Sequence, residues 1–378
     1  MAQKSMLLEL LEPGFARNII ARKPRGDSGL LTDYVQFPFT AIVGQQEMKL
    51  ALVLTVINPR VGGVLLIGPR GTGKTTAVRG LIDLLPPVER STCRYGCEPQ
   101  DALTGGMDAV CAECAAKLAR GEPITAPDKM KLIELPLNAR LEDVIGGIDE
   151  RVALEKQRVR LEKGLLALAD KNILYVDEIN LLNDAVTDAI LDAAAQGRYT
   201  VRRGPLTATY RARIILIGSM NPEEGSLRPQ IMDRLGLRVI VNRLENARDR
   251  IEVYRRMIQF AQTPYTLIEN YAEDLVAMGE EIQEAQKLLP HVKVTPLAED
   301  FIMEAILRLK IASNRTEFVA LEAARAYAAA DGRTMVTDED VRAVALMALR
   351  QRRSEFMDRY FEQSQGEDRE IKQVIDSL

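Results

Sequence analysis

The chain has 378 residues, which is enough for two or three domains of about 100–200 residues each. Hydrophobic residues make up 47% of it and charged residues 28%, a globular composition that excludes a largely disordered or fibrous chain. The net charge of −4 disfavours a dedicated nucleic-acid-binding protein, because neutralising phosphates requires a basic surface, although a local basic loop stays compatible with it.

The N-terminal region gives no targeting signal. No apolar run approaches the ~20 residues that span a bilayer, and residues 1–11 lack the regions of a signal peptide. We therefore expect a cytoplasmic protein without a membrane partner. Residues 1–35 are expected to form a tail, in which residues 6–11 could form a short amphipathic helix.

The first motif lies between a short apolar run at residues 63–67 and a helix-like stretch at residues 76–82. Its sequence, G-P-R-G-T-G-K-T, matches the phosphate-binding loop pattern in its strand–loop–helix setting. Glycines let backbone N–H groups close around phosphates, Lys74 would reach the β- and γ-phosphates, and the Thr75 hydroxyl would bind Mg²⁺. The complete motif disfavours the alternative, a purely structural turn. The nucleotide-binding residues predicted here are Gly68, Gly71, Thr72, Gly73, Lys74, Thr75 and Thr76.

A second apolar strand, residues 173–176, ends in Asp177 and Glu178. Asp177 is expected to bind Mg²⁺ directly or through its second shell, and Glu178 to act as the general base on the attacking water. The chain has one histidine, His291, which we expect at the surface, so proton transfer must fall to carboxylates. Such an acidic pair is common at strand ends. It indicates a hydrolytic site here because it follows a phosphate-binding loop in the same chain.

A third apolar run, residues 213–220, ends at Asn221 and Pro222. The Asn221 amide could orient the lytic water, since ligands of open α/β sheets bind beyond the carboxyl ends of the strands. A simple turn-forming role is the alternative, because asparagine before proline favours turns. Arg234, at the end of an expected helix, fits an arginine finger that reaches the ATP of a neighbouring subunit, with a solvated helix end as the alternative.

These motifs together resemble the AAA+ ATPase I subunit of magnesium chelatase. The resemblance covers about residues 36–350 and includes the blocks at residues 37–45, 174–182 and 221–234. It implies an α/β fold, with a P-loop AAA+ parallel-sheet core, a helical C-terminal lid domain, and a β-hairpin at residues 197–210. Carried over by position, it makes Asn221 a sensor, Arg234 the finger and Arg315 a second sensor from the lid, and it adds Val43 and Gln45 to the nucleotide contacts.

The resemblance also implies cofactors and partners. ATP and Mg²⁺ would be turned over in a homo-oligomeric ring, expected to be a hexamer, that drives a von Willebrand-type AAA+ partner and a large porphyrin-binding subunit. The complex would insert Mg²⁺ into protoporphyrin IX, for chlorophyll or bacteriochlorophyll biosynthesis. Three alternatives stay open: a cobalt chelatase or another von Willebrand-type partner, a nucleotide-dependent switch or scaffold, and a nucleic-acid motor that uses Arg202 and Arg203 at the hairpin tip.

The organisation along the chain follows from these positions. The core is expected at residues 36–242, because the long interval between Lys74 and Asp177 must hold inserts, which we place at residues 88–130 and 135–165. Helical periodicity without strands predicts the lid at residues 243–353, and a charged tail follows at residues 354–378. Within the lid, Thr337 and Asp340 have the spacing of a capping box.

The four cysteines are grouped in one short window of the first insert. Cys93 and Cys97 are separated by three residues, Cys111 and Cys114 by two, and thirteen residues lie between the pairs. Two close pairs have the spacing of a tetrahedral zinc site, which would give a surface insert the core it lacks. Redox-active thiols, incidental pairs in a loop and a [4Fe–4S] cluster are the alternatives.

Overall fold

The computed structural model describes residues 35–93, 95–148, 161–204, 206–225 and 227–352, together with residue 373. The helix expected at residues 6–11 lies outside the described residues, as do residues 1–34 and all of the C-terminal tail except residue 373. Within the described ranges, the helices are all too short or too polar to pass through a lipid bilayer.

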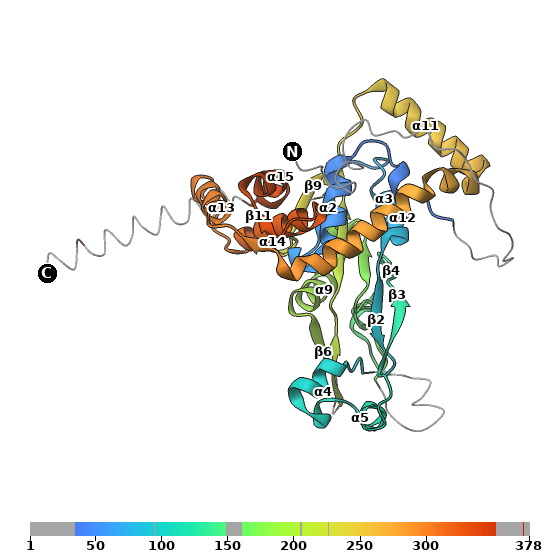
Figure 1. Ribbon diagram of the computed structural model, residues 1–378, viewed down its shortest axis with the longest axis vertical. Helices are drawn as coiled ribbons and strands as arrows, with labels where there is room; N and C mark the ends of the chain where they lie inside the picture. Colours follow the sequence, from blue (N-terminus) through green and yellow to red (C-terminus); the bar gives the residue numbers. More distant parts are fainter. Residues whose placement is uncertain are drawn as a thin grey trace.

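The core is a five-stranded, fully parallel sheet with the strand order β4-β5-β8-β1-β9 (Figure 1). Its strands are β1 (Val64–Ile67), β4 (Leu132–Leu135), β5 (Ile173–Val176), β8 (Ile215–Met220) and β9 (Leu237–Ile240). Successive side chains of β1 face opposite sides: Leu66 packs into one hydrophobic core, and Leu65 and Ile67 into another. The sheet is therefore buried on both faces, which explains why its strands are almost continuously apolar.

Helices cover the two faces. One core contains α2 (Gln46–Ile57), α3 (Lys74–Gly80) and most of the lid helices. The other contains α6 (Leu141–Ile145), α8 (Leu165–Leu168), α9 (Asp184–Gln196) and α10 (Pro229–Arg234). Short 3₁₀-helices complete the chain at Phe39–Ala41, Pro59–Val61, Leu81–Leu84, Met107–Ala109, Ile179–Leu181, Pro222–Glu224 and Leu289–His291.

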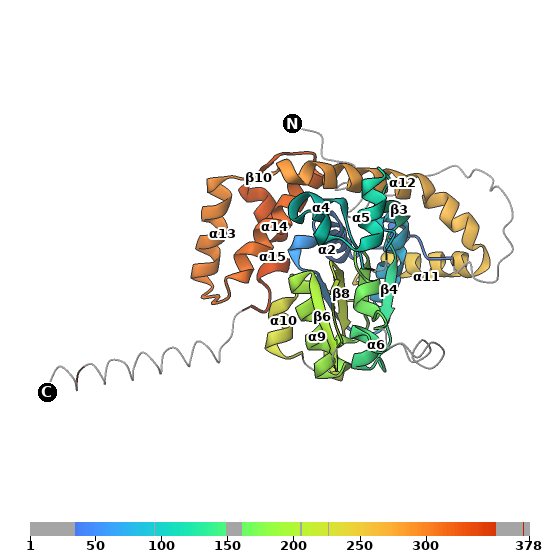
Figure 2. The ribbon, with the colours of Figure 1, turned by 90° about the horizontal axis from the view of Figure 1, so that it is seen from below.

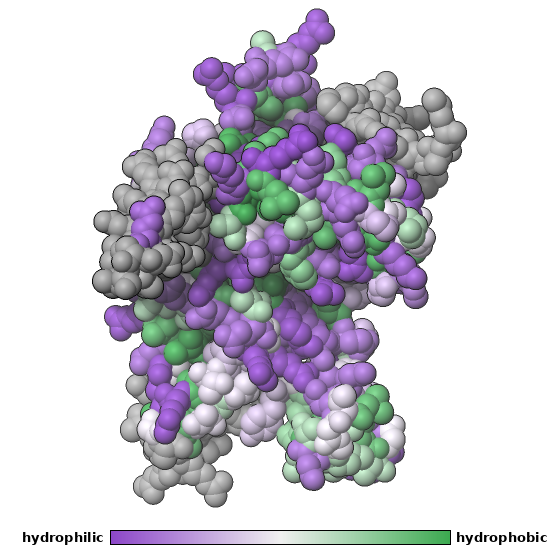
Figure 3. All heavy atoms as spheres, turned by 90° about the vertical axis from the view of Figure 1, so that its left-hand side faces the viewer, coloured by the Kyte–Doolittle hydropathy of each residue, from purple (hydrophilic) through white to green (hydrophobic). Residues whose placement is uncertain are grey.

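Two antiparallel strand pairs extend from the core toward the bottom of Figure 1. The first joins β2 (Pro87–Ser91) to β3 (Thr125–Lys129), with α4 (Pro99–Gly105) and α5 (Ala112–Ala119) between them. The second is the predicted hairpin of β6 (Arg198–Arg203) and β7 (Leu206–Arg211). Figures 2 and 3 show that α4 and α5 form a projection of their own, beside the one that contains β6.

The lid consists of α11 (Ala247–Gln262), α12 (Pro264–Leu288), α13 (Pro296–Arg308), α14 (Arg315–Ala330) and α15 (Asp338–Leu349). The expectation that this region lacks strands was wrong, because β10 (Lys293–Val294) pairs in parallel with β11 (Met335–Val336). Strands of two residues are too short to leave a periodic pattern. The predicted capping box is confirmed: the Thr337 N–H donates to the Asp340 carboxylate over 2.8 Å.

Arg352 fastens the end of the lid to the core. Its side chain is completely buried. The guanidinium donates to the carbonyl oxygens of Leu235 (3.2 Å) and Gly236 (2.7 Å), and lies 3.1 Å from the Asp233 carboxylate. Asp233 and Leu235 flank the predicted finger residue Arg234, so one buried cation joins the lid to the segment that presents the finger.

Replacing Arg352 by methionine should lower the free energy of unfolding by about 3 kcal/mol, because it leaves several buried oxygen acceptors without a donor. Urea denaturation of the full chain measures this. Arg308→Met is the matched control, since the side chain of Arg308 is 79% exposed, and it should change stability by less than about 0.5 kcal/mol. Equal effects of the two substitutions would contradict the role of Arg352.

Candidate functional site

The loop between β1 and α3 has the backbone geometry of a phosphate cradle. Gly71 and Gly73 have φ values of +77° and +86°, and a Cβ added to either would meet no atom within 4 Å. Their glycine identity is therefore set by backbone conformation rather than by crowding. Gly68 is different, because a Cβ there would lie 2.3 Å from the Val241 carbonyl oxygen. The first glycine thus lets the loop pass close to the end of β9.

A cavity of about 230 Å³ lies in front of this loop, at the carboxyl ends of β1, β5 and β8. The structure brings together here the loop, the acidic pair after β5 and the asparagine after β8, as predicted. The residues that line the cavity are Arg70, Gly71, Thr72, Gly73, Lys74, Thr75, Thr76, Asp177, Glu178, Ser219, Met220 and Asn221.

Lys74 is almost buried in the loop. Its ammonium group donates to the carbonyl oxygens of Gly68 (2.7 Å) and Pro69 (2.8 Å). Burial lowers the pKa of Lys74, whereas the carboxylates of Asp177, Glu178 and Glu224 act in the opposite direction. The cation is thereby held at the place where a triphosphate would need it.

Thr75 and Asp177 form an oxygen-rich pair that fits Mg²⁺. The Thr75 hydroxyl lies 3.3 Å from the Asp177 carboxylate, and a hydroxyl and a carboxylate are the hard ligands this ion prefers. The Tyr175 hydroxyl lies 3.1 Å from Thr75 Oγ1 and donates to Asp177 Oδ1 over 2.9 Å. Burial raises the pKa of Tyr175 well above its usual range, so it remains a neutral hydrogen-bond donor.

Ser219 completes the support of the acidic pair. Its hydroxyl donates to Asp177 Oδ1 and accepts the backbone N–H of Glu178 over 3.1 Å. Sequence analysis missed Tyr175 and Ser219, although both left a signal: each is a hydroxyl-bearing residue in an otherwise apolar strand.

Glu178 occupies a left-handed backbone conformation, with φ at +52°, which is uncommon for a residue with a side chain. Arg70 lies 3.1 Å from its carboxylate and 2.5 Å from that of Glu224. Arg70 therefore holds the expected general base against the loop. The motif gave no role to this position, because any residue can occupy it.

Asn221 is buried at the end of β8 and lines the cavity. Its side-chain oxygen accepts the backbone N–H of Glu223 over 3.2 Å, which is the turn-forming bond. Both interpretations of this residue therefore have a structural basis. Val43 and Gln45 lie outside the residues that line the cavity; Gln45 donates to the Asn242 carbonyl oxygen over 2.8 Å, just beyond β9.

Arg234 and Arg315 lie together, but not beside the loop. Both line a second cavity, of about 670 Å³, which is also bounded by Gly62 and Ile215 at the amino ends of β1 and β8. Arg315 donates to the carbonyl oxygen of Asp233 over 3.4 Å. Four residues of β1 separate the two ends of the sheet, roughly 13 Å at ~3.3 Å per residue. The two arginines thus face the opposite end of the sheet from the phosphate loop.

Arg234 is held by an ion pair with Asp192 of α9 at 2.5 Å. The side chain of Arg234 is 37% exposed, and that of Asp192 55%. An exposed pair of this kind exchanges readily for a stronger anion. Arg234 is therefore partly open to solvent in this chain.

The four cysteines form a separate cluster. The sulfurs of Cys93, Cys97, Cys111 and Cys114 all lie within 4.8 Å of one another, and all four are free thiols. They could bind a metal. None of them lines the phosphate cavity.

Fold and site together define a P-loop ATPase of the AAA+ class with a helical lid. The family models agree: residues 150–237 match the MCM P-loop domain, and residues 299–374 match the AAA lid domain.

More specific comparisons are with whole proteins. The chain is 42% identical, over 86% of its length and 88% of the relative's, to the magnesium-chelatase subunit ChlI homolog of Methanocaldococcus jannaschii. It is also 42% identical to the ChlI subunit of Nostoc sp., over 84% of both chains. The chain therefore belongs to the ChlI/BchI family of magnesium-chelatase ATPase subunits. A cryo-EM-based model of the BchI–BchD complex matches at 36% identity, over 84% of this chain and 96% of that chain, with a TM-score of 0.46.

Ser219→Ala should lower the turnover of ATP by about 10–100-fold, because Asp177 and Glu178 lose a shared hydrogen-bonding partner, while ATP affinity changes little. Phosphate release and binding of a fluorescent nucleotide measure the two quantities. Thr200→Ala, on the exposed hairpin, is the control. An unchanged kcat in Ser219→Ala would show that the hydroxyl does not position the acidic pair.

Proposed function

We propose that this ATPase works as a ring of identical subunits, expected to be a hexamer, in which each ATP lies between two chains. The observation that supports this is the separation of Lys74 and Glu178 from Arg234 and Arg315 at opposite ends of one sheet. Within one chain the arginines are remote from the phosphate cavity. A head-to-tail arrangement brings the arginine end of one subunit to the loop end of the next, and such heterologous contacts close into rings.

The residues of the phosphate cavity divide the work of hydrolysis. Lys74 neutralises charge on the β- and γ-phosphates, while Thr75 and Asp177 hold Mg²⁺, which when bound offsets further phosphate charge. Glu178 accepts a proton from the attacking water, and the buried amide of Asn221 orients that water. Because Arg70 pairs with Glu178, that ion pair must loosen before the carboxylate can contact the water.

The neighbouring subunit would complete the pocket. Arg234 would exchange Asp192 for the γ-phosphate and stabilise the charge that develops during transfer. Arg315 lies close enough to Asp233 to approach the same phosphate from the lid. Turnover in one site would then depend on the position of the next subunit's lid.

Family membership supports a chelatase partner. We propose that the ring drives a von Willebrand-type AAA+ subunit and a large porphyrin-binding subunit that inserts Mg²⁺ into protoporphyrin IX. The porphyrin chemistry is assigned to the partner, because the hydrolytic residues described above serve the turnover of ATP.

Two variants that are inactive alone should become active when mixed. Lys74→Ala loses the triphosphate, whereas Arg234→Ala binds ATP but cannot turn it over. Random mixing at equal amounts pairs an intact loop with an intact finger at roughly a quarter of the interfaces, so a corresponding share of wild-type phosphate release should return.

The matched control is a mixture of Lys74→Ala with Glu178→Gln. Both changes lie in the same half of the site, so no interface regains a complete loop half and the mixture should stay inactive. If Arg234→Ala and Lys74→Ala form mixed rings, as native mass spectrometry would detect, and yet release no phosphate, the trans arrangement is wrong. Full activity of demonstrably monomeric wild-type chain would overturn it as well.

Reconstitution tests the partner. The chain, combined with the two other subunits of a magnesium chelatase, ATP, Mg²⁺ and protoporphyrin IX, should form the magnesium porphyrin, detected by its fluorescence, and Glu178→Gln should abolish this. Insertion of Co²⁺ but not Mg²⁺ by the corresponding cobalt system would favour the cobalt alternative. ATPase activity stimulated by DNA at low salt would favour a nucleic-acid motor instead.

A further inference from the structure

The cysteine cluster lies in a small module that has almost no core of its own. Besides cysteines, its buried apolar side chains among the described residues are Val110 and Ile124, with a few partly buried ones packed against them. Leu103 is 80% exposed and Met107 50%, so two of its larger apolar side chains lie at the surface. So little apolar burial does not hold a module of two short helices and their loops in place, and small modules of this kind depend on disulfides or metals.

We propose that Cys93, Cys97, Cys111 and Cys114 bind one structural Zn²⁺, and that this ion holds the acidic loop that clamps the base of the β6–β7 hairpin. A tetrahedral Zn²⁺ with bonds of about 2.3 Å holds four sulfurs about 3.8 Å apart, so the observed limit of 4.8 Å needs only side-chain adjustment. A four-iron cluster binds each thiolate to a different iron and holds the sulfurs further apart, so the compact arrangement fits one ion better.

Hydrogen-bond donors lie beside two of the four sulfurs. The backbone N–H of Cys97 donates to Cys93 Sγ over 3.4 Å, and the backbone N–H of Cys111 donates to Cys97 Sγ over 3.3 Å. The Ser91 hydroxyl donates to Cys93 Sγ over 3.4 Å. Cys111 and Cys114 lie at the N-terminal end of α5, where the helix dipole also favours negative charge. Three donors therefore point at two of the proposed ligands, Cys93 and Cys97.

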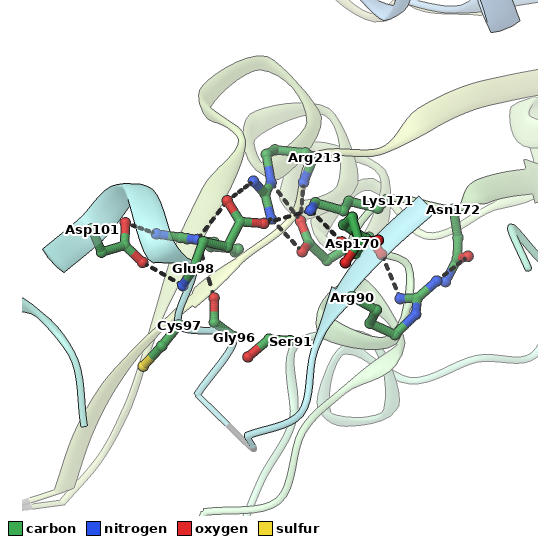
Figure 4. A network of polar contacts seen from close by, with 12 residues as sticks. Arg90, Ser91, Gly96, Cys97, Glu98, Asp101, Asp170, Lys171, Asn172 and Arg213 are labelled. Atoms are coloured by element: carbon green, nitrogen blue, oxygen red, sulfur yellow. Dashed lines mark hydrogen bonds and ion pairs between the residues drawn. The ribbon is translucent and has the colours of Figure 1, made fainter. Parts of the chain in front are cut away.

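The clamp begins at the residue after a proposed ligand. Glu98 follows Cys97, and its carboxylate accepts from Arg213 over 2.8 and 2.9 Å and lies 2.6 Å from the Lys171 ammonium. Figure 4 shows Glu98 directed toward these cations while the sulfur of Cys97 points away on the other side of the loop. The Glu98 carboxylate thus contacts two cations at once.

The clamp reaches the hairpin through Arg211, the last residue of β7. Arg211 donates to the Gly96 carbonyl oxygen over 3.1 Å, pairs with Glu98 at 3.1 Å and pairs with Asp101. Asp170 adds a third carboxylate, 2.7 Å from Arg213. Three carboxylates thus face three cations, so the network is neutral and depends on the position of the loop that carries Glu98 and Asp101.

This network also adjoins the arginine end of the sheet. Lys171 and Arg213 line the same 670 Å³ cavity as Arg234 and Arg315. Glu98, on the metal-bound loop, contacts both Arg213 and Lys171, so the loop keeps these two cations paired at the edge of the surface that would face the next subunit. The proposed ion is thus structural and separate from the Mg²⁺ of the phosphate cavity.

Metal analysis of the full chain, purified under reducing conditions, tests the site. Inductively coupled plasma mass spectrometry should find about one zinc per chain in the wild type, and about tenfold less in Cys114→Ser. Ser91→Ala is the control that touches a ligand without being one, and it should retain zinc. Iron in place of zinc, or four freely titrating thiols without metal, would overturn the assignment.

Hydrogen–deuterium exchange tests the clamp without any substitution. Stripping the wild-type chain with a chelator should speed exchange by about tenfold in both the module and residues 206–214, and adding Zn²⁺ alone should restore it. Glu98→Gln should retain zinc and speed exchange only at residues 206–214. Unchanged exchange there after zinc removal would refute the clamp even if the metal is bound. Neither result depends on whether the proposed ring or chelatase partner is correct.

Discussion

The two halves of the proposed ATP site lie at opposite ends of one five-stranded parallel sheet, and this constraint organises the molecule. Parallel strands place all their carboxyl ends at one edge, where the loop, Asp177, Glu178 and Asn221 meet. Arg234, which precedes β9, and Arg315, which belongs to the lid, lie at the other end of the sheet. Because both faces of the sheet are buried under helices, the two ends cannot approach each other within a chain.

Hydroxyl groups rather than further charges shape the phosphate cavity. Tyr175 and Ser219 each bond Asp177, and Ser219 also holds the unusual backbone of Glu178. These neutral donors fix the Asp177 carboxylate without placing a further charge beside it. Arg70 is the exception, since it pairs with Glu178 directly and sets the resting position of that side chain.

Guanidinium groups connect parts of the chain that are distant in sequence. Arg352 links the end of the lid to the finger segment, and Arg213 links the cysteine module to the hairpin base and to Asp170. In each case several oxygen acceptors surround one planar cation, which suits the fork of N–H donors that arginine offers. Both links end near Arg234 and Arg315. The lid and the insert therefore both contact the region proposed to meet the neighbouring subunit.

The sequence determined the local chemistry: the loop with Lys74 and Thr75, the acidic pair after β5, the strand that ends at Asn221, and the grouping of four cysteines. These features depend on neighbouring residues and on periodicity, which a sequence displays directly. Only the tertiary structure decided that Ser219 supports Asp177, that Arg315 lies beside Arg234, and that Glu98 meets Arg213, because each pair joins residues more than 40 positions apart. Nor did periodicity predict β10 and β11, since two-residue strands form through pairing across the lid and carry no pattern of their own.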